Sequence, residues 1–222
     1  MNTADFYFKG VSRIDLDIIP DFHELTVLLN QHLVNFRENV AHWIERYPGV
    51  FDLCGTDGDQ LFQVIANLYA DTNLSTVISE ITGMELAIGD SVLRLNSNSQ
   101  HSYMPKHRDT FKRGNKIVGR IQPLMKIAYF PEILGSDKKV FTYYQGTQLR
   151  YSENRLLDHL MAFAGRKISF KPDDRSLVLF NSFGYHAAHP ADVTNSYSPR
   201  LLINLCQKTQ VRSFSRHNRS EQ

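Results

Sequence analysis

The sequence predicts a mainly β fold with a helical buttress, in which an antiparallel jelly roll forms the core. Many short apolar runs of strand length, separated by turn residues, favour an antiparallel sandwich or barrel. The first third of the chain instead has apolar residues at helical spacing. With 222 residues, the chain has the length of one domain. We expect helices in about 1–83, the jelly-roll core in about 84–207 and a flexible tail at 208–222.

The helical part is expected to contain one long and two shorter helices. From Asp21 to about Tyr47, apolar residues recur every three or four positions. The stretch Phe51–Asp59, which is rich in Gly and Asp, reads as a loop. Shorter helices are predicted over Gln60–Ala70 and Leu74–Thr82, and Gly83 ends the second one. Such helices would pack against one face of a sheet.

The core is predicted from short runs of β-branched, aromatic and aliphatic residues. The strand candidates are Ser91–Leu95, Lys126–Phe130, Val140–Tyr144, Lys167–Phe170, Leu177–Phe180 and Leu201–Leu205. One helix, Glu153–Ala164, is expected to be inserted between two of them. The jelly roll is the antiparallel form that suits the candidate metal ligands described next.

Two short motifs contain candidate metal ligands. His107 and Asp109 are two positions apart, so in an extended chain their side chains point to the same side. His186 follows the apolar run Leu177–Phe180 after a turn that contains Gly184. Two imidazoles and one carboxylate are the set that binds non-haem Fe(II) on one face and leaves other positions open. A His-x-Asp pair alone is weak, but the ordered combination is more specific.

A cation begins the last strand candidate. Arg200 directly precedes Leu201–Leu205. A guanidinium on a strand next to the metal ligands can bind a carboxylate through two parallel hydrogen bonds. The sequence thus indicates an iron site with an acid-bearing cosubstrate beside it.

These motifs resemble the Fe(II)- and 2-oxoglutarate-dependent oxygenases, and most closely the phytanoyl-CoA dioxygenase-like family. His107–Thr110 is similar to the first family motif. Phe141–Thr147 resembles the segment F-x-Y-x-P-G-S-H, although Gln145 replaces its proline and Gln148 its histidine. Phe180–His186 resembles the strand and turn that carry the distal histidine. The resemblance is local and falls within residues 86–207.

The resemblance implies that His107, Asp109 and His186 are iron ligands and that Arg200 binds the distal carboxylate of 2-oxoglutarate. Fe(II), 2-oxoglutarate and O₂ would then support hydroxylation of an unactivated C–H bond, with release of succinate and CO₂. Related halogenating enzymes have a small residue in place of the carboxylate, so Asp109 favours oxygenation. The spacing from His186 to Arg200 is longer than usual in the wider group, which leaves His189 as an alternative ligand. Its distance from the apolar strand and from the glycine favours His186.

Two other classes of protein are compatible with the same residues. A cupin-like enzyme would use the metal without 2-oxoglutarate, and Arg200 would then belong to a structural ion pair. A catalytically silent binding module would keep the fold, with His107 and His186 as ordinary polar residues. Succinate formation separates the oxygenase from the cupin-like enzyme, and tight metal binding separates both from the silent module.

A basic stretch follows the first motif. Between Thr110 and Pro131 there is no acidic residue, whereas five residues are basic. A solvated surface loop is the plain explanation. The functional hypothesis is that Arg113 and Lys116 bind an anionic small-molecule substrate, such as a phosphate, a carboxylate or a carrier-linked acyl group. No RNA-recognition motif or stacking platform is present, so we do not expect a nucleic-acid partner.

Composition indicates a reduced, soluble protein. No apolar run reaches the length that crosses a membrane, and the first residues lack a signal-peptide pattern. Cys54 and Cys206 are the two cysteines and have no metal-binding or redox spacing. A cytoplasmic protein without a membrane partner is the expectation.

Overall fold

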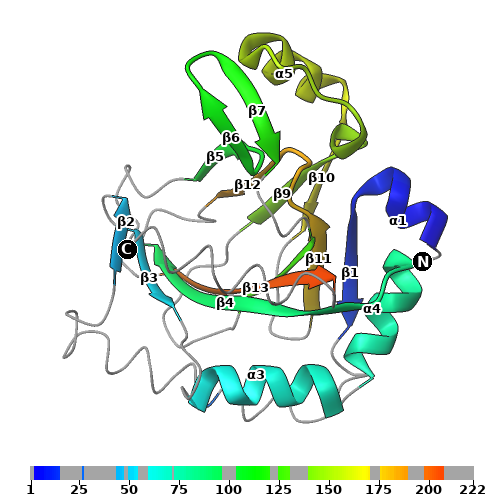
Figure 1. Cartoon of the computed structure of the whole chain (residues 1–222), viewed down its shortest axis with the longest axis vertical. Helices are drawn as coiled ribbons and strands as arrows, with labels where there is room; N and C mark the ends of the chain where they lie inside the picture. Colours follow the sequence, from blue (N-terminus) through cyan, green and yellow to red (C-terminus); the bar gives the residue numbers. More distant parts are fainter. Residues whose placement is uncertain are drawn as a thin grey trace.

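The computed structural model describes residues 3–15, 27, 44–47, 50–54, 60–71, 73–96, 104–120, 125–130, 140–170, 176–189 and 198–207. Two stacked β-sheets occupy its middle (Figure 1). Helices α3 (Gln60–Asp71) and α4 (Leu74–Thr82) lie at one end (Figure 1). The hairpin of β6 (Thr110–Arg113) and β7 (Lys116–Arg120) lies with helix α5 (Arg155–Met161) at the opposite end.

The larger sheet has seven strands in the order β1-β11-β8-β13-β4-β3-β2, and its neighbouring strands pair antiparallel. Its strands are β1 (Val11–Asp15), β2 (Ile44–Tyr47), β3 (Val50–Cys54), β4 (Leu86–Asn96), β8 (Met125–Tyr129), β11 (Ser176–Asn181) and β13 (Ser198–Gln207).

The smaller sheet has four strands in the order β10-β9-β12-β5. They are β5 (Met104–His107), β9 (Val140–Gln145), β10 (Arg166–Phe170) and β12 (His186–His189). Strands β6 (Thr110–Arg113) and β7 (Lys116–Arg120) form a separate hairpin. Two layers of four, β11-β8-β13-β4 and β10-β9-β12-β5, make up a jelly roll, so the predicted fold class is confirmed.

The helices are α1 (Thr3–Lys9), α3 (Gln60–Asp71), α4 (Leu74–Thr82), α5 (Arg155–Met161) and the 3₁₀ turns η3 (Thr147–Leu149) and η4 (Ala162–Ala164). The two shorter helices predicted in the front third and the inserted helix are therefore confirmed. Gly83 ends α4 with a φ of 70°, a left-handed conformation that glycine adopts without strain. None of the helices in the described ranges is long and apolar enough to cross a membrane.

Alternation along the strands of the larger sheet divides its side chains between two cores. On β8, Ile127 and Tyr129 pack against the helices, whereas Ala128, and Phe130 directly after the strand, face the smaller sheet. On β13, Leu201, Ile203 and Leu205 belong to the helix-facing core. Arg200 has the opposite parity and therefore lies between the two sheets.

The N-terminal part is not purely helical, which corrects the prediction. β1, β2 and β3 all lie before residue 84 and extend the larger sheet at both of its edges. Ile44–Tyr47 forms a strand rather than the end of a helix, and the start of the expected loop Phe51–Asp59 belongs to β3. Pairing with β4, which neither local spacing nor composition can reveal, stabilises this extended conformation. Apart from residue 27, the rest of the expected long helix lies outside the described residues, as does the expected tail at 208–222.

Candidate metal centre

Three side chains with metal-binding atoms meet where the smaller sheet ends. His107 is the last residue of β5, His186 is the first residue of β12, and the two are direct partners in the antiparallel pair. Asp109 follows β5, and its N–H donates a hydrogen bond of 3.0 Å to the carbonyl oxygen of Ser182 in the turn before β12. One ligand atom from each of His107, Asp109 and His186 lies within 4.8 Å of the others. We call these three residues the ligand cluster.

His186 is held in the tautomer that a metal ligand needs. Its Nδ1 lies 2.9 Å from the carbonyl oxygen of Gly184. Because a carbonyl can only accept, Nδ1 carries the proton and Nε2 retains its lone pair. Burial, followed by the neighbouring His107, lowers the pKa of His186 to about 3. The imidazole is therefore neutral at pH 7 and can bind a cation through Nε2.

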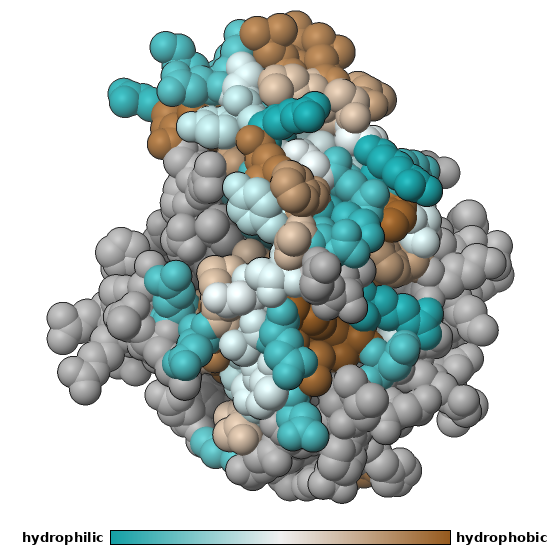
Figure 2. Space-filling view, turned by 90° about the vertical axis from the view of Figure 1, so that its right-hand side faces the viewer, coloured by the Kyte–Doolittle hydropathy of each residue, from teal (hydrophilic) through white to brown (hydrophobic). Residues whose placement is uncertain are grey.

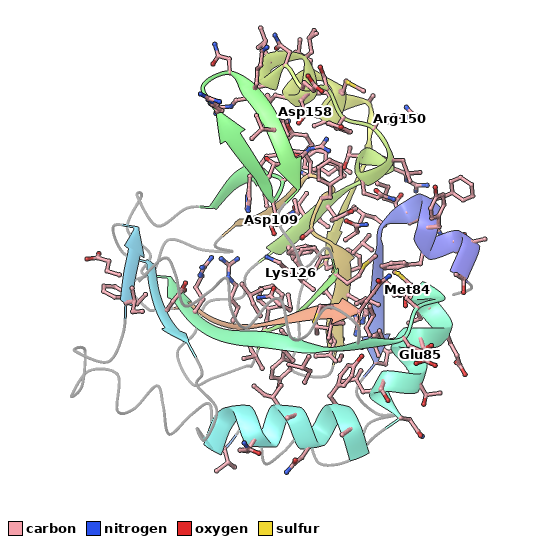
Figure 3. All side chains as sticks on the ribbon, viewed as in Figure 1. Met84, Glu85, Asp109, Lys126, Arg150 and Asp158 are labelled. Atoms are coloured by element: carbon pink, nitrogen blue, oxygen red, sulfur yellow. The ribbon has the colours of Figure 1, made fainter. Side chains whose placement is uncertain are left out.

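Asp109 is held as a carboxylate by a cation that sequence reading missed. Burial raises the pKa of Asp109, but the Lys126 ammonium and the two imidazoles outweigh it and hold the pKa well below its usual range. Lys126 Nζ lies 2.7 Å from Oδ2 of Asp109. The other oxygen, Oδ1, lies 3.8 Å from Nε2 of His107. One oxygen is thus engaged by Lys126, and the other lies toward His107. Asp109 and Lys126 are both labelled in Figure 3.

Arg200 is a buried cation on the inner face of β13, only 6% exposed. Its neighbour across the strands is Arg94 on β4, which pairs with the buried Asp52 on β3. Within the described part of the chain, Nε of Arg200 has no hydrogen-bond partner. Burial, followed by the like charge of Arg94, lowers the pKa of Arg200 to about 9. An anion beside Arg200 would relieve both effects.

A single cavity of about 300 Å³, the inner pocket, joins the ligand cluster to Arg200. Its polar side chains are Arg94, His107, Arg108, Asp109, Thr110, Lys126, His186 and Arg200. Its apolar side chains are Ala128, Phe130, Phe141, Phe180 and Leu202. Among the described lining residues, four cations and a single carboxylate give the inner pocket a net positive charge, which suits an anionic ligand.

The structure brings four of the predicted site residues to one cavity and places two others at the surface. His107, Asp109, His186 and Arg200 line the inner pocket. His189 is paired with Val140 on β9, and its side chain lies outside what the structure describes. Arg113 and Lys116 flank the turn of the β6–β7 hairpin, are exposed and do not line the inner pocket. Their binding of substrate stays a prediction.

Arg94 and Lys126 are the residues that sequence reading did not select for the site. Each is a cation inside an apolar strand, as in Leu93-Arg94-Leu95 and Met125-Lys126-Ile127. A charge at an inward position of such a strand needs a partner or a ligand. That signal is present in the sequence and marks both positions as candidates.

Gln148, which stands where the resembling family has a histidine, has a structural role. Its Nε2 donates hydrogen bonds of 2.8 and 3.1 Å to the carbonyl oxygens of Tyr7 and Phe8. It therefore connects η3 to helix α1. It does not line the inner pocket.

Arg108, between the two candidate ligands of the first motif, anchors helix α5. Its Nε lies 3.0 Å from Oδ2 of Asp158, and its Nη2 donates to the carbonyl oxygen of Arg150 at 3.1 Å. The hydroxyl of Tyr185 donates to the same carboxylate oxygen at 2.5 Å. Arg108 and Asp158 are almost fully buried, at 3% and 0% exposure. This network connects α5 directly to the segment that carries His107 and Asp109.

No protein-family model matches the sequence, and no curated protein is detectably related. Solved structures, however, resemble the fold. The non-heme alpha ketoglutarate dependent carbocyclase SnoK from nogalamycin biosynthesis has a TM-score of 0.67 at 11% identity, over 92% of this chain and 82% of that one. HygX from Streptomyces hygroscopicus, solved with nickel, 2-oxoglutarate and hygromycin B, has a TM-score of 0.61 at 12% identity, over 92% and 86%.

A prolyl-4-hydroxylase from Pseudomonas putida is a third similar structure, with a TM-score of 0.56 at 12% identity, over 93% of this chain and 97% of that one. At such low identity these similarities establish the jelly-roll fold. The phytanoyl-CoA dioxygenase-like resemblance is not confirmed by a family match.

Proposed function

We propose that this protein is a non-haem iron enzyme that uses 2-oxoglutarate and O₂ to oxidise a small molecule, with hydroxylation as the expected outcome. The observation that carries the proposal is the inner pocket. It combines a His/Asp/His ligand cluster with a buried arginine for which no carboxylate partner is found among the described residues. The fold similarity to SnoK and HygX supports the same class.

The ligand cluster fits a divalent metal ion. His186 offers Nε2, because its Nδ1 is engaged by Gly184. His107 Nε2 and Asp109 Oδ1 face each other, while Lys126 occupies the second carboxylate oxygen. Two nitrogens and one carboxylate oxygen form the donor set that suits Fe(II) and leaves positions open for other ligands.

Four residues of the inner pocket would then have distinct roles. His107, Asp109 and His186 would hold the iron, which supplies the oxidative chemistry once 2-oxoglutarate and O₂ are bound. Arg200 would bind the distal carboxylate of 2-oxoglutarate and orient its other end toward the ligand cluster.

The remaining wall of the inner pocket is apolar. Phe130, Phe141, Phe180 and Leu202 line it. These side chains would exclude water from the reacting groups, which strengthens the electrostatic interactions made there.

The test is an anaerobic titration with Fe(II) followed by 2-oxoglutarate, in which a chelated oxoacid is detected by its visible metal-to-ligand charge-transfer band. We expect the band in the wild-type protein and its loss in His107→Ala and His186→Ala. His189→Ala is the matched control for the alternative ligand and should keep the band. Arg200→Ala should bind iron but require much more 2-oxoglutarate for the same absorbance.

Other outcomes would identify the competing classes. Iron binding without the band would indicate a cupin-like enzyme that does not use 2-oxoglutarate. Absence of tight iron binding would indicate a silent binding module. Loss of the band in His189→Ala but not in His186→Ala would transfer the distal ligand role to His189.

A further inference from the structure

A second cavity, the outer pocket, opens between helix α5 and the β6–β7 hairpin. Its volume is about 540 Å³. Its lining includes His107, Arg108 and Thr110, which also line the inner pocket. The two pockets are therefore adjacent, and a molecule in the outer pocket would lie next to the ligand cluster.

The outer pocket contains two cations without an acidic partner among the described residues. Lys106 on β5 places its Nζ 3.6 Å from the ring centre of Phe163 and 5.7 Å from that of Tyr185, and no ion pair is found for it in the described ranges. Arg155, the first residue of α5, donates from Nη1 to the carbonyl oxygen of Gly114 at 3.2 Å. Both cations can therefore bind an anionic group of a molecule in the outer pocket.

The other ionisable groups of the outer pocket do not cancel this charge. Asp158, the one carboxylate among the described lining residues, is completely buried and engaged by Arg108 and by the hydroxyl of Tyr185. Burial, and then the charge of Lys106, lowers the pKa of His159, so its imidazole is neutral at pH 7. The outer pocket consequently has a net positive charge.

The walls between these cations are partly apolar. Ile117 on β7, Leu156 on α5 and the ring of Tyr185 line the outer pocket. Leu156 is 68% exposed, and the α5 end of the molecule shows a concentration of apolar side chains (Figure 2). Thr110 lies where the two pockets meet, and its buried hydroxyl has no hydrogen-bond partner among the described residues. It is available to hydrogen-bond a polar group near the ligand cluster.

We propose that the outer pocket is the substrate site and that it takes an anionic molecule with an apolar body, whose phosphate, sulfate or carboxylate group is bound by Lys106 and Arg155. The apolar body would lie between Ile117 and Leu156, with its far end near Thr110 and the ligand cluster. This inference rests on the proposed function, since the bound molecule is a substrate only if the protein is the proposed enzyme. Lys106 and Arg155, which line a cavity, thus take the anion-binding role that the sequence suggested for Arg113 and Lys116 at the hairpin turn.

The experiment measures binding of 1-naphthyl phosphate and of its neutral counterpart 1-naphthol by isothermal titration calorimetry, with the full chain and without added metal or 2-oxoglutarate. We expect Lys106→Gln and Arg155→Gln each to weaken binding of the phosphate about tenfold and to leave binding of the alcohol unchanged. Lys167→Gln, an exposed cation of β10 that lines neither pocket, is the matched control and should bind both probes as the wild type does.

Three results would overturn the proposal. The phosphate could bind no more tightly than the alcohol, or the Lys106 and Arg155 variants could bind it as well as the wild type. Alternatively, Arg200→Gln could abolish binding while Lys106→Gln does not, which would place the anion in the inner pocket. Arg155 is exposed, so its variant remains informative if Lys106→Gln does not fold. Since no iron is used, a failed charge-transfer titration and a failed probe titration remain distinguishable.

Discussion

Arg94 and Arg200 are cross-strand partners on β4 and β13, yet only one of them has a carboxylate partner among the described residues. Two hydrogen bonds of 2.5 and 2.6 Å connect Arg94 to the buried Asp52. Arg200 lies beside this pair in the inner pocket and has a lowered pKa. Asp52 thus neutralises the charge of Arg94, whereas the guanidinium of Arg200 is available to bind an anionic ligand.

Replacing Arg200 should therefore have opposite effects on the stability of the ligand-free protein and on the binding of 2-oxoglutarate. We expect Arg200→Met to raise the free energy of unfolding of the ligand-free protein by about 1 kcal/mol, because a buried charge beside a like charge is removed. The same variant should lose the stabilisation that 2-oxoglutarate gives to the metal-loaded wild type. Urea unfolding with and without the cosubstrate measures both effects.

The matched control for that variant is its neighbour. Arg94→Met removes the guanidinium that pairs with the buried Asp52 and should destabilise the protein by about 3–5 kcal/mol. Equal destabilisation by both substitutions would contradict the assignment of Arg200 as the ligand-binding cation.

Lys126 should control the pH range in which the ligand cluster binds metal. The low pKa of Asp109 means that its ion pair with Lys126 is stabilising above the ordinary carboxyl pKa and is lost only as the pH falls through the lower folded value. In Lys126→Met, burial would dominate and raise the pKa of Asp109, so protons would compete better with the metal. We expect the pH at which Co(II) dissociates to rise by about one unit.

The absorbance of bound Co(II) during an acid titration measures the midpoint, which is the pH at which half of the metal has dissociated. Lys167→Met removes an exposed lysine from β10 and should leave it unchanged. A midpoint in Lys126→Met at or below that of the wild type would show that the lysine does not hold Asp109 ionised.

Gly184 is expected to be required for stability and metal binding because it has no side chain. A Cβ at this position would overlap the hydroxyl and ring of Tyr143, which is fully buried. Gly184→Ala should cost about 2 kcal/mol of stability and displace the carbonyl that holds Nδ1 of His186, thereby weakening metal binding.

Gly114→Ala in the hairpin turn is a useful comparison. Its φ of 57° makes alanine unfavourable by about 1 kcal/mol, but no atom lies within 4 Å of the added carbon. Thermal unfolding and Co(II) affinity should distinguish the two variants, since only Gly184→Ala is expected to affect the metal. Normal Co(II) affinity in Gly184→Ala would refute the positioning role.

Asp158 should stabilise the attachment of α5 through Arg108. Asp158→Leu would leave the guanidinium buried without its carboxylate and should cost about 3–5 kcal/mol. The double variant Arg108→Met/Asp158→Leu should recover most of that loss, because no uncompensated charge remains. Urea unfolding of Arg108→Met, Asp158→Leu and the double variant gives the coupling energy, and a coupling near zero would mean that the pair contributes little.

Local sequence was sufficient to predict the ligand cluster. The two-residue separation of His107 and Asp109, and the turn at Gly184 before His186, depend on conformations that a few neighbouring residues determine. Several strands were likewise predicted to within one or two residues, such as β8 and β11. Short strands bounded by turns are recognisable because burial of one or both faces selects their residue types.

β2 and β3 were missed for a different reason. The helical spacing over Asp21–Tyr47 extends into Ile44–Tyr47, so the local pattern favours a helix where the structure has a strand. In β3, Asp52 looks like a loop residue until Arg94 is placed opposite it. The free energy that stabilises β3 comes from β4, a strand more than thirty residues later in the chain.

Local sequence patterns were enough to predict the jelly-roll class, the three residues of the ligand cluster and an arginine near the start of the last strand. Three features became visible only once the chain was folded: Lys126 pairs with Asp109, Asp52 pairs with Arg94 rather than Arg200, and Lys106 and Arg155 line a cavity. Spacing along one segment determines where its own side chains point. The partner of a buried charge depends on which distant strands become neighbours, and that is settled by packing of the whole chain.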